Sequence, residues 1–116
     1  MDSSSGSCEV NACVSTLLSE SIDAVLDNIL GGRVKQTIYG CLERQGLRKY
    51  QIPEDLRGFD AFLEEKFGRG SGVIERQIAR RLYASLGLEL TEVPHFALAD
   101  YVDIASRRLS QVKRLA

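Results

Sequence analysis

The stretch Phe67–Leu88, FGRGSGVIERQIARRLYASLGL, decides the fold. A glycine-rich turn leads into a run whose apolar residues recur every four positions: Ile74, Ile78, Leu82 and Leu86. This recurrence keeps one face of a helix apolar along its length, whereas a half-buried strand alternates apolar and polar residues. The pattern therefore predicts the central helix of an all-α protein.

Four more helices are predicted around this one from apolar residues at helical spacing. Their expected ranges are residues 11–30, 33–45, 59–67 and about 95–116. Gly31-Gly32 and Gly46 can end the first two, because glycine adopts the left-handed conformation that closes many helices. Gly58 and Gly68 bracket the third. We expect a compact bundle of about five helices.

Two connections are expected to lack α-helix. Ile52-Pro53 lies in the first, residues 47–58, and a proline moves the preceding residue toward an extended conformation, so we predict a loop. The second, Leu88–Val93, has the alternating sequence LELTEV. A single strand would have no partner, so we predict an extended linker there.

Length and composition indicate one domain. The chain has 116 residues, of which 44% are hydrophobic, and this length is typical of a single domain. Residues 1–7, MDSSSGS, are small and polar, so we predict a disordered tail over residues 1–10 and a single helical domain over residues 11–116. No run approaches the roughly 18 apolar residues of a membrane span, and the amino terminus lacks a secretion signal. We therefore expect a soluble cytoplasmic protein without membrane association.

The cysteines argue against a metal centre. Cys8, Cys13 and Cys41 form no Cys-x-x-Cys pair, and the single histidine, His95, is far from them in sequence. Zinc sites use closely spaced ligands of these types, so no metal and no cofactor is expected. An odd cysteine count in a chain with enough apolar residues for a core favours reduced thiols in the cytosol.

No catalytic constellation is found, so a non-enzymatic protein is predicted. Adjacent acids such as Glu64-Glu65 and Glu54-Asp55 point in different directions and form no acid/base pair. His95 has no cysteine or serine predicted near it and is interpreted as a surface or capping residue.

The turn Gly68–Gly72 has backbone N–H groups that can cradle an anion, with Arg69 beside them. One hypothesis is therefore an enzyme or anion-binding protein that uses this turn. A phosphate-binding loop, however, needs a Lys and a Ser or Thr after its last glycine, where Val73 and Ile74 stand. The preferred interpretation is a tight turn between helices with Ser71 as the cap.

Basic side chains mark the expected contact surfaces. Lys and Arg number 15 against 16 Asp and Glu, so no overall field attracts nucleic acid. We expect contacts with an unidentified protein partner through Arg69, Arg76, Gln77, Arg80, Arg81, Arg107 and Arg108. The last helix has a heptad spacing, in Leu98, Val102, Ala105, Leu109 and Val112. This spacing favours packing on the chain's own bundle, with a homodimer through this helix as the alternative.

A rival hypothesis is a helix-turn-helix DNA-binding protein that uses residues 68–86. The second helix would then offer Arg76, Gln77, Arg80 and Arg81 to DNA. Glu64 stands where that motif favours a small residue, and the net charge is −1. A protein-interaction module with a regulatory role is therefore the preferred prediction, and nucleic acid binding is the alternative.

The order of glycine, proline and apolar residues between positions 22 and 90 resembles that of a known family. These residues include Leu30-Gly31, Ile52-Pro53, Phe67-Gly68-x-Gly70 and Leu82-Tyr83-x-x-Leu86-Gly87-Leu88. Together they resemble the archaeal nitrosopumilus output domain family. The resemblance implies a small helical domain, alone or attached to signalling modules, with an output role and no established catalysis. It supplies no functional residues.

Overall fold

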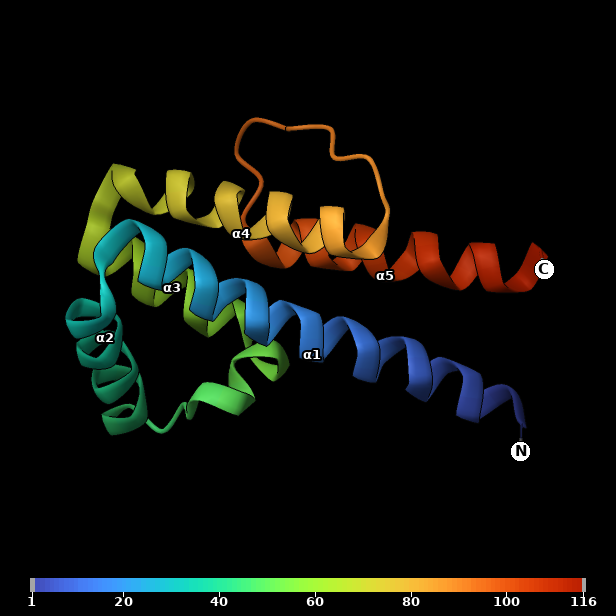
Figure 1. Ribbon diagram of the computed structural model, residues 1–116, viewed down its shortest axis with the longest axis horizontal. Coiled ribbons are helices and arrows are strands. Elements are labelled where there is room, and N and C mark those ends of the chain that lie inside the picture. The colour runs from blue at the N-terminus through green and yellow to red at the C-terminus, as the bar shows by residue number, and fades with distance from the viewer. Residues whose placement is uncertain (1, 116) are drawn as a thin grey trace.

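The computed structural model describes the backbone of residues 2–115 and the side chains of residues 13–110. Over that backbone the chain forms five α-helices and two short 3-10 helices, with no strand (Figure 1). The α-helices are α1 Asp2–Leu30, α2 Gly32–Arg44, α3 Leu56–Phe67, α4 Ser71–Leu86 and α5 Leu98–Leu115, and the 3-10 helices are η1 Lys49–Glu54 and η2 Gly68–Gly70. The predicted all-α fold is confirmed. The tail predicted over residues 1–10 falls outside the described side chains.

The central helix is α4, as predicted. It contacts α1, α3 and α5, and its contact with α1 is the most extensive. The inward face of α4 is completely or almost completely buried and consists of Ile74, Ile78, Ala79, Leu82 and Tyr83. Phe59, Phe62 and Leu63 of α3 pack against it in the same core. Truncation of a buried phenylalanine to alanine costs about 3 to 5 kcal/mol, so α3 supplies much of the stability.

The turn between α3 and α4 corrects one prediction. Gly68 ends α3 with a φ of 55°, which glycine adopts without strain. Ser71 does not cap α4, because its own backbone is already helical, with φ −59° and ψ −38°. Its hydroxyl donates back to the Gly68 carbonyl at 2.8 Å. The prediction of Ser71 as the cap is therefore wrong.

Two helix starts differ from their predicted positions. The predicted loop before α3 contains η1, and α3 begins at Leu56 because the Asp55 side chain accepts a hydrogen bond from the Gly58 N–H at 3.1 Å. Gly58 thus lies inside the helix. At the other end of the chain, α5 begins at Leu98, after a connecting segment of residues 87–97 that contains neither helix nor strand. The linker predicted over Leu88–Val93 lies in this segment.

The inward face of α5 is rotated from the predicted seam. Leu98, Tyr101 and Ala105 are completely buried, whereas Val102 and Leu109 are half-buried. This face packs on α1, α3 and α4. Packing of the last helix on its own bundle is thus confirmed, and the homodimer stays a prediction. No helix of the described residues has the length and apolar character needed to cross a membrane.

Candidate functional site

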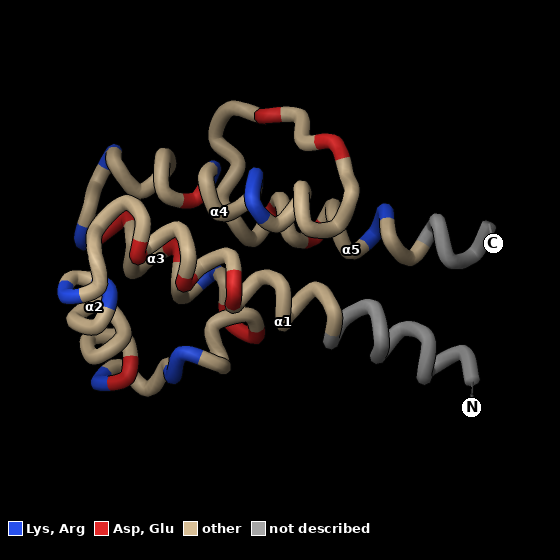
Figure 2. Tube along the Cα trace, in the orientation of Figure 1, with Lys and Arg blue, Asp and Glu red and all other residues tan. Residues whose placement is uncertain are grey.

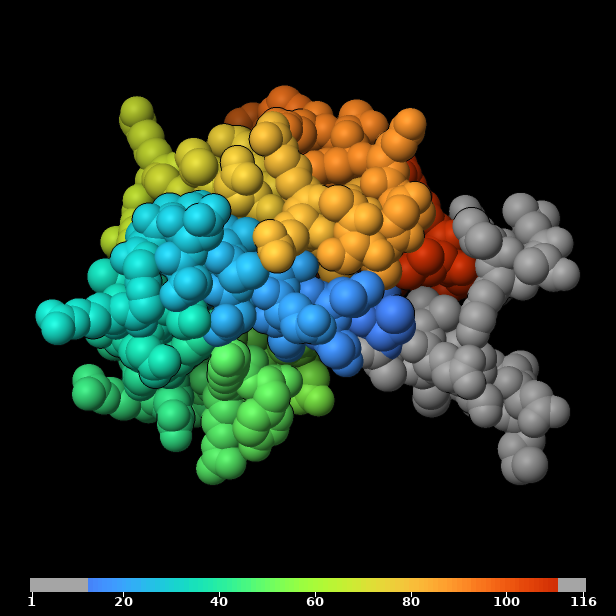
Figure 3. All heavy atoms as spheres, viewed as in Figure 1, coloured from blue at the N-terminus to red at the C-terminus, as the bar shows by residue number. Residues whose placement is uncertain are grey.

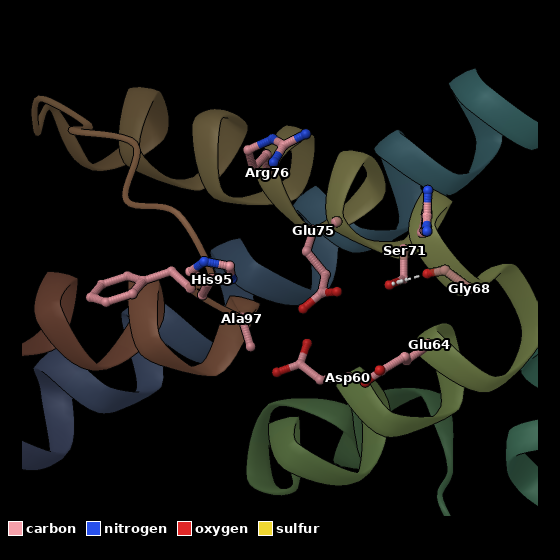
Figure 4. Close-up of a pocket in the computed structure, with 11 residues that line it drawn as sticks. Asp60, Glu64, Gly68, Ser71, Glu75, Arg76, His95 and Ala97 are labelled. Atoms are coloured by element: carbon pink, nitrogen blue, oxygen red, sulfur yellow. Dashed lines mark hydrogen bonds between the residues drawn. The ribbon is translucent and has the colours of Figure 1, made fainter.

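A hollow of about 530 Å³, here called the carboxyl hollow, lies between α3, η2, α4 and the end of the connecting segment. Asp60 of α3 and Glu75 of α4 line it and are only 8% and 6% exposed. Their carboxyl groups point toward each other (Figure 4). We call them the carboxyl pair.

The carboxyl pair holds the start of α5. Glu75 Oε1 accepts a hydrogen bond from the Leu98 N–H at 3.0 Å, and Asp60 Oδ2 accepts one from the Ala99 N–H at 3.1 Å. Asp100 Oδ2 accepts a third from the Ala97 N–H at 2.9 Å. The first N–H groups of a helix have no acceptor within it and form its positive end, where carboxylates are favourable. The start of α5 is therefore capped mainly by side chains of other helices.

The environment of Asp60 disfavours its charged form. Burial, and then the neighbouring Glu75 carboxyl, raise the pKa of Asp60 to about 8, against the opposing influence of the Ala99 N–H and Arg57. One oxygen, Asp60 Oδ1, is buried without a hydrogen-bond partner among the described residues. A buried acceptor without a partner costs about 1 to 3 kcal/mol, so this oxygen calls for an explanation.

Exposed side chains surround the carboxyl pair at the edge of the hollow. They are Glu64, Arg69, Arg76 and His95, and Arg76 points away from the pair (Figure 4). His95 has a φ of 70°, the left-handed region that residues other than glycine rarely adopt, and it turns the chain toward α5. The prediction of His95 as a surface residue is confirmed, while the capping role belongs to the three carboxylates.

The carboxyl hollow combines acids with a histidine, which the sequence spacing does not predict. Among the described side chains, however, His95 makes no hydrogen bond to Asp60 or Glu75. Within residues 13–110 no group of three or more His, Cys, Asp or Glu is placed to hold a metal ion. Cys13 is exposed and Cys41 is half-buried against the core, and both are free thiols.

A second hollow of about 660 Å³ lies between α1 and α4, and we call it the α1–α4 groove. Gln77, Arg80 and Arg81 line it from α4, opposite Asp27 and Asn28 of α1. In Figure 3 the surface of α4 is exposed between α1 and the connecting segment. The groove thus brings together three of the seven predicted contact residues, while Arg69 and Arg76 line the carboxyl hollow instead.

Three of the predicted contact arginines are used within the molecule. Arg80 forms an ion pair with Glu92 of the connecting segment, which loops out beside α4 and carries acidic positions in Figure 2. Arg80 is the main cause that holds the pKa of Glu92 below its usual range. Arg108 donates to the Glu89 carbonyl at 2.8 Å. Arg107 pairs at 3.0 Å with Asp103, one turn earlier on α5.

The other predicted contact residues on α4 remain free to bind a partner. Arg76, Gln77 and Arg81 are exposed, and within the part of the chain whose side chains are described they form no ion pair or hydrogen bond. These three residues have the exposed position expected of a contact surface.

Asp60 and Glu75 are missing from the sequence prediction, although each has a signal. Asp60 falls at helical spacing with Leu63 and Phe67, and Glu75 with Ile78 and Ala79. Each acid is therefore on the buried stripe of its helix, where an ionisable residue is rare unless it is paired. Acids on the inward faces of two consecutive helices indicate a buried pair.

Comparisons with known proteins supply no relative on which a function could be based. No family model, no curated protein and no solved structure matches the chain. The resemblance to the nitrosopumilus output domain family therefore stays a prediction, and the function has to be argued from the geometry of the site.

Proposed function

We propose that this protein is a non-enzymatic interaction module that binds an acidic segment of a protein partner along α4. The observation that carries the proposal is the exposed row Arg76, Gln77 and Arg81 on the helix whose opposite face is the core. A surface on the central helix is rigid, so its side chains keep their spacing without a further ordering cost. A cytoplasmic setting and a signalling output role belong to the proposal and rest on the sequence alone.

The chemistry of the α1–α4 groove favours carboxylates. Each guanidinium group offers several N–H donors in a planar fork that matches a carboxylate, and Gln77 adds an amide that donates and accepts. Ala24 and Ala84 also line the groove, and their small side chains leave room for a peptide backbone. Asp27 on the opposite wall lies 3.5 Å from Lys35, which offsets part of its negative charge.

DNA binding is less well supported by the same geometry. The order α3, η2, α4 does place two helices around a short turn. However, α4 is packed between three other helices, and Arg80 is already paired with Glu92. Proteins that bind duplex DNA tightly neutralise on the order of 6 to 10 phosphates, which the three arginines exposed on α4 do not approach.

The test compares two charge-matched double variants. Arg76→Glu with Arg81→Glu reverses the proposed surface, and Arg33→Glu with Arg44→Glu makes the same change of charge on exposed positions of α2. The probes are a labelled peptide of alternating Glu and Leu and a labelled DNA duplex, titrated by fluorescence anisotropy at low salt. We expect the α4 variant to lose about tenfold in affinity for the peptide, since two exposed ion pairs contribute up to about 1 kcal/mol each. The α2 variant should keep wild-type affinity.

Two outcomes would contradict the proposal. Equal losses of affinity in both variants would mean that peptide binding depends only on the net charge of the protein. Tighter binding of the duplex than of the peptide, with affinity that falls steeply as salt rises, would favour the DNA-binding alternative.

A further inference from the structure

We propose that Asp60 and Glu75 share one proton, that this proton fastens the start of α5 to α3 and α4, and that its loss at mildly alkaline pH loosens this attachment. This proton lies in the carboxyl hollow, and of the proposed contact residues Arg76, Gln77 and Arg81 only Arg76 lines that hollow.

The hydrogen bonds around the carboxyl pair leave one place for a proton. Glu75 and Asp60 each use one oxygen to accept from consecutive N–H groups, those of Leu98 and Ala99. The remaining oxygen of Asp60 is buried without a partner among the described residues, and the two carboxyl groups point toward each other (Figure 4). Two ionised carboxylates at this position would repel each other. A proton between them replaces that repulsion with a short, charge-assisted hydrogen bond and gives the free oxygen its partner.

A metal cation fits this place less well than a proton. Ca²⁺ takes six to eight oxygen ligands, and Mg²⁺ needs an octahedral set. In each of the two carboxyl groups one oxygen already accepts a hydrogen bond from an N–H of α5. The third acid of the hollow, Glu64, is exposed. Arg69 and Arg76, which also line the hollow, would repel a cation.

The charged groups around the carboxyl pair come from every element packed against it. They are Arg57 and Glu64 on α3, Arg69 on η2, Arg76 on α4, His95 in the connecting segment and Asp100 on α5. The cation that acts most on Asp60 is Arg57, but it is exposed and lies 2.9 Å from Asp100. No buried cation among the described residues therefore takes the place of the shared proton.

The pH dependence follows from the direction of the shift. The pKa of Asp60 rises from 3.8 to about 8 on folding, so the folded protein holds a proton that the unfolded chain has released. Between these values the folded state binds more protons, and its stability falls as pH rises. One proton changes the folding equilibrium about tenfold per pH unit. The stability contributed by this proton is complete below the lower value and lost above the higher one.

The first experiment measures the unfolding equilibrium in urea from pH 5 to pH 9. We expect the wild-type unfolding constant to rise about tenfold per pH unit up to about pH 8. Asp60→Asn keeps the shape and an oxygen acceptor for α5 but removes the group that holds the proton, so it should flatten this dependence. Glu75→Gln removes the second carboxyl but leaves Asp60 buried, so it should weaken the dependence without abolishing it. The matched control is His95→Asn, which retains a residue that tolerates a positive φ and should keep the full dependence. Two conservative variants are used so that, if one of them folds poorly, the other still tests the proposal.

The second experiment locates the effect by amide hydrogen exchange on the wild-type protein. Above pH 8 we expect the Leu98 and Ala99 amides to exchange faster than the ordinary rise of base-catalysed exchange predicts. The Leu26 amide in the core helix α1 should follow that ordinary rise.

Three results would overturn the proposal. One is a wild-type stability that does not change between pH 5 and pH 8. Another is an unfolding constant that becomes independent of pH in His95→Asn alone. The third is a rise in melting temperature with Ca²⁺ or Mg²⁺ that Glu75→Gln abolishes, which would make the pair a cation site instead.

Discussion

Asp23 and Asp60 both join helices of this bundle, but they do so in opposite surroundings. Asp23 on α1 is partly exposed and lies 3.2 Å from Lys35 Nζ, 3.1 Å from Lys49 Nζ and 3.2 Å from the Tyr39 hydroxyl, which ties α2 and η1 to α1. Asp60 on α3 is buried beside a second acid, and among the described residues it accepts one hydrogen bond, from the Ala99 N–H of α5. The first junction uses cations at the surface, and the second uses the positive end of a helix.

The two aspartates show how surroundings set the charge of one side-chain type. Burial opposes ionisation at both positions. At Asp23, Lys49, Lys35 and Tyr39 outweigh burial and hold the pKa below its usual range. Among the described side chains no such cation contacts the Asp60 carboxyl, and Glu75 adds to the effect of burial, so the pKa of Asp60 rises. Asp23 therefore stabilises the fold above its usual titration range and loses that effect as pH falls, whereas Asp60 stabilises it at low pH and loses that effect as pH rises.

The largest expected effect comes from removal of a buried acceptor. Glu75→Ala leaves the Leu98 N–H without its acceptor and opens a space beside Asp60. A buried unpaired donor costs about 1 to 3 kcal/mol, so we expect a loss of about 2 kcal/mol in unfolding free energy at pH 6. Urea unfolding measures this loss. The control is Glu64→Ala, an exposed acid of the same hollow, which should stay within about 0.5 kcal/mol of wild type. Equal costs for the two variants would refute the capping role of Glu75.

A smaller effect is expected at the exposed junction. Asp23→Asn removes the charge that Lys35 and Lys49 contact, and because Asp23 is about one third exposed we expect a loss of about 1 kcal/mol or less at low salt. High salt should reduce this loss, since exposed charges are screened, but should leave the cost of Glu75→Ala unchanged. Acid unfolding is the second measurement. The variant should lose less stability than wild type as pH falls from 5 to 3, and a loss equal to that of wild type would speak against the pairing.

The smallest effect is expected where both partners are in water. Arg107 and Asp103 form an ion pair on α5 with side chains that are 74% and 58% exposed. Arg107→Ala should change the midpoint of thermal unfolding by no more than the error of the measurement, because exposed pairs of this kind contribute little. A clear destabilisation would indicate that Arg107 has another contact in solution.

The sequence predicts the helices well because their signal is local. Ile74, Ile78 and Leu82 follow one another at helical spacing, and no distant residue is needed to recognise that face. The start of α5 is different, since its acceptors on Glu75 and Asp60 are 23 and 39 residues earlier. Pro94 and His95 suggest a helix start that lies a few residues too early, and no local pattern places it at Leu98.

The same distinction applies to the predicted contact residues. The exposure of Arg76, Gln77 and Arg81 follows from the helical face on which they lie. Arg80 pairs with Glu92, and Arg108 donates to the Glu89 carbonyl. Both contacts depend on where the connecting segment crosses the bundle. Sequence spacing alone does not give that path.

The origin of the caps of α5 has a consequence for the order of folding. Glu75 and Asp60 can receive the Leu98 and Ala99 N–H groups only after α3 and α4 have come together. Until then the first turn of α5 has only the local acceptor on Asp100. We therefore expect the α3–α4 hairpin to form early and α5 to complete its amino-terminal turn late, with substitutions at Glu75 changing the rate of unfolding more than the rate of folding.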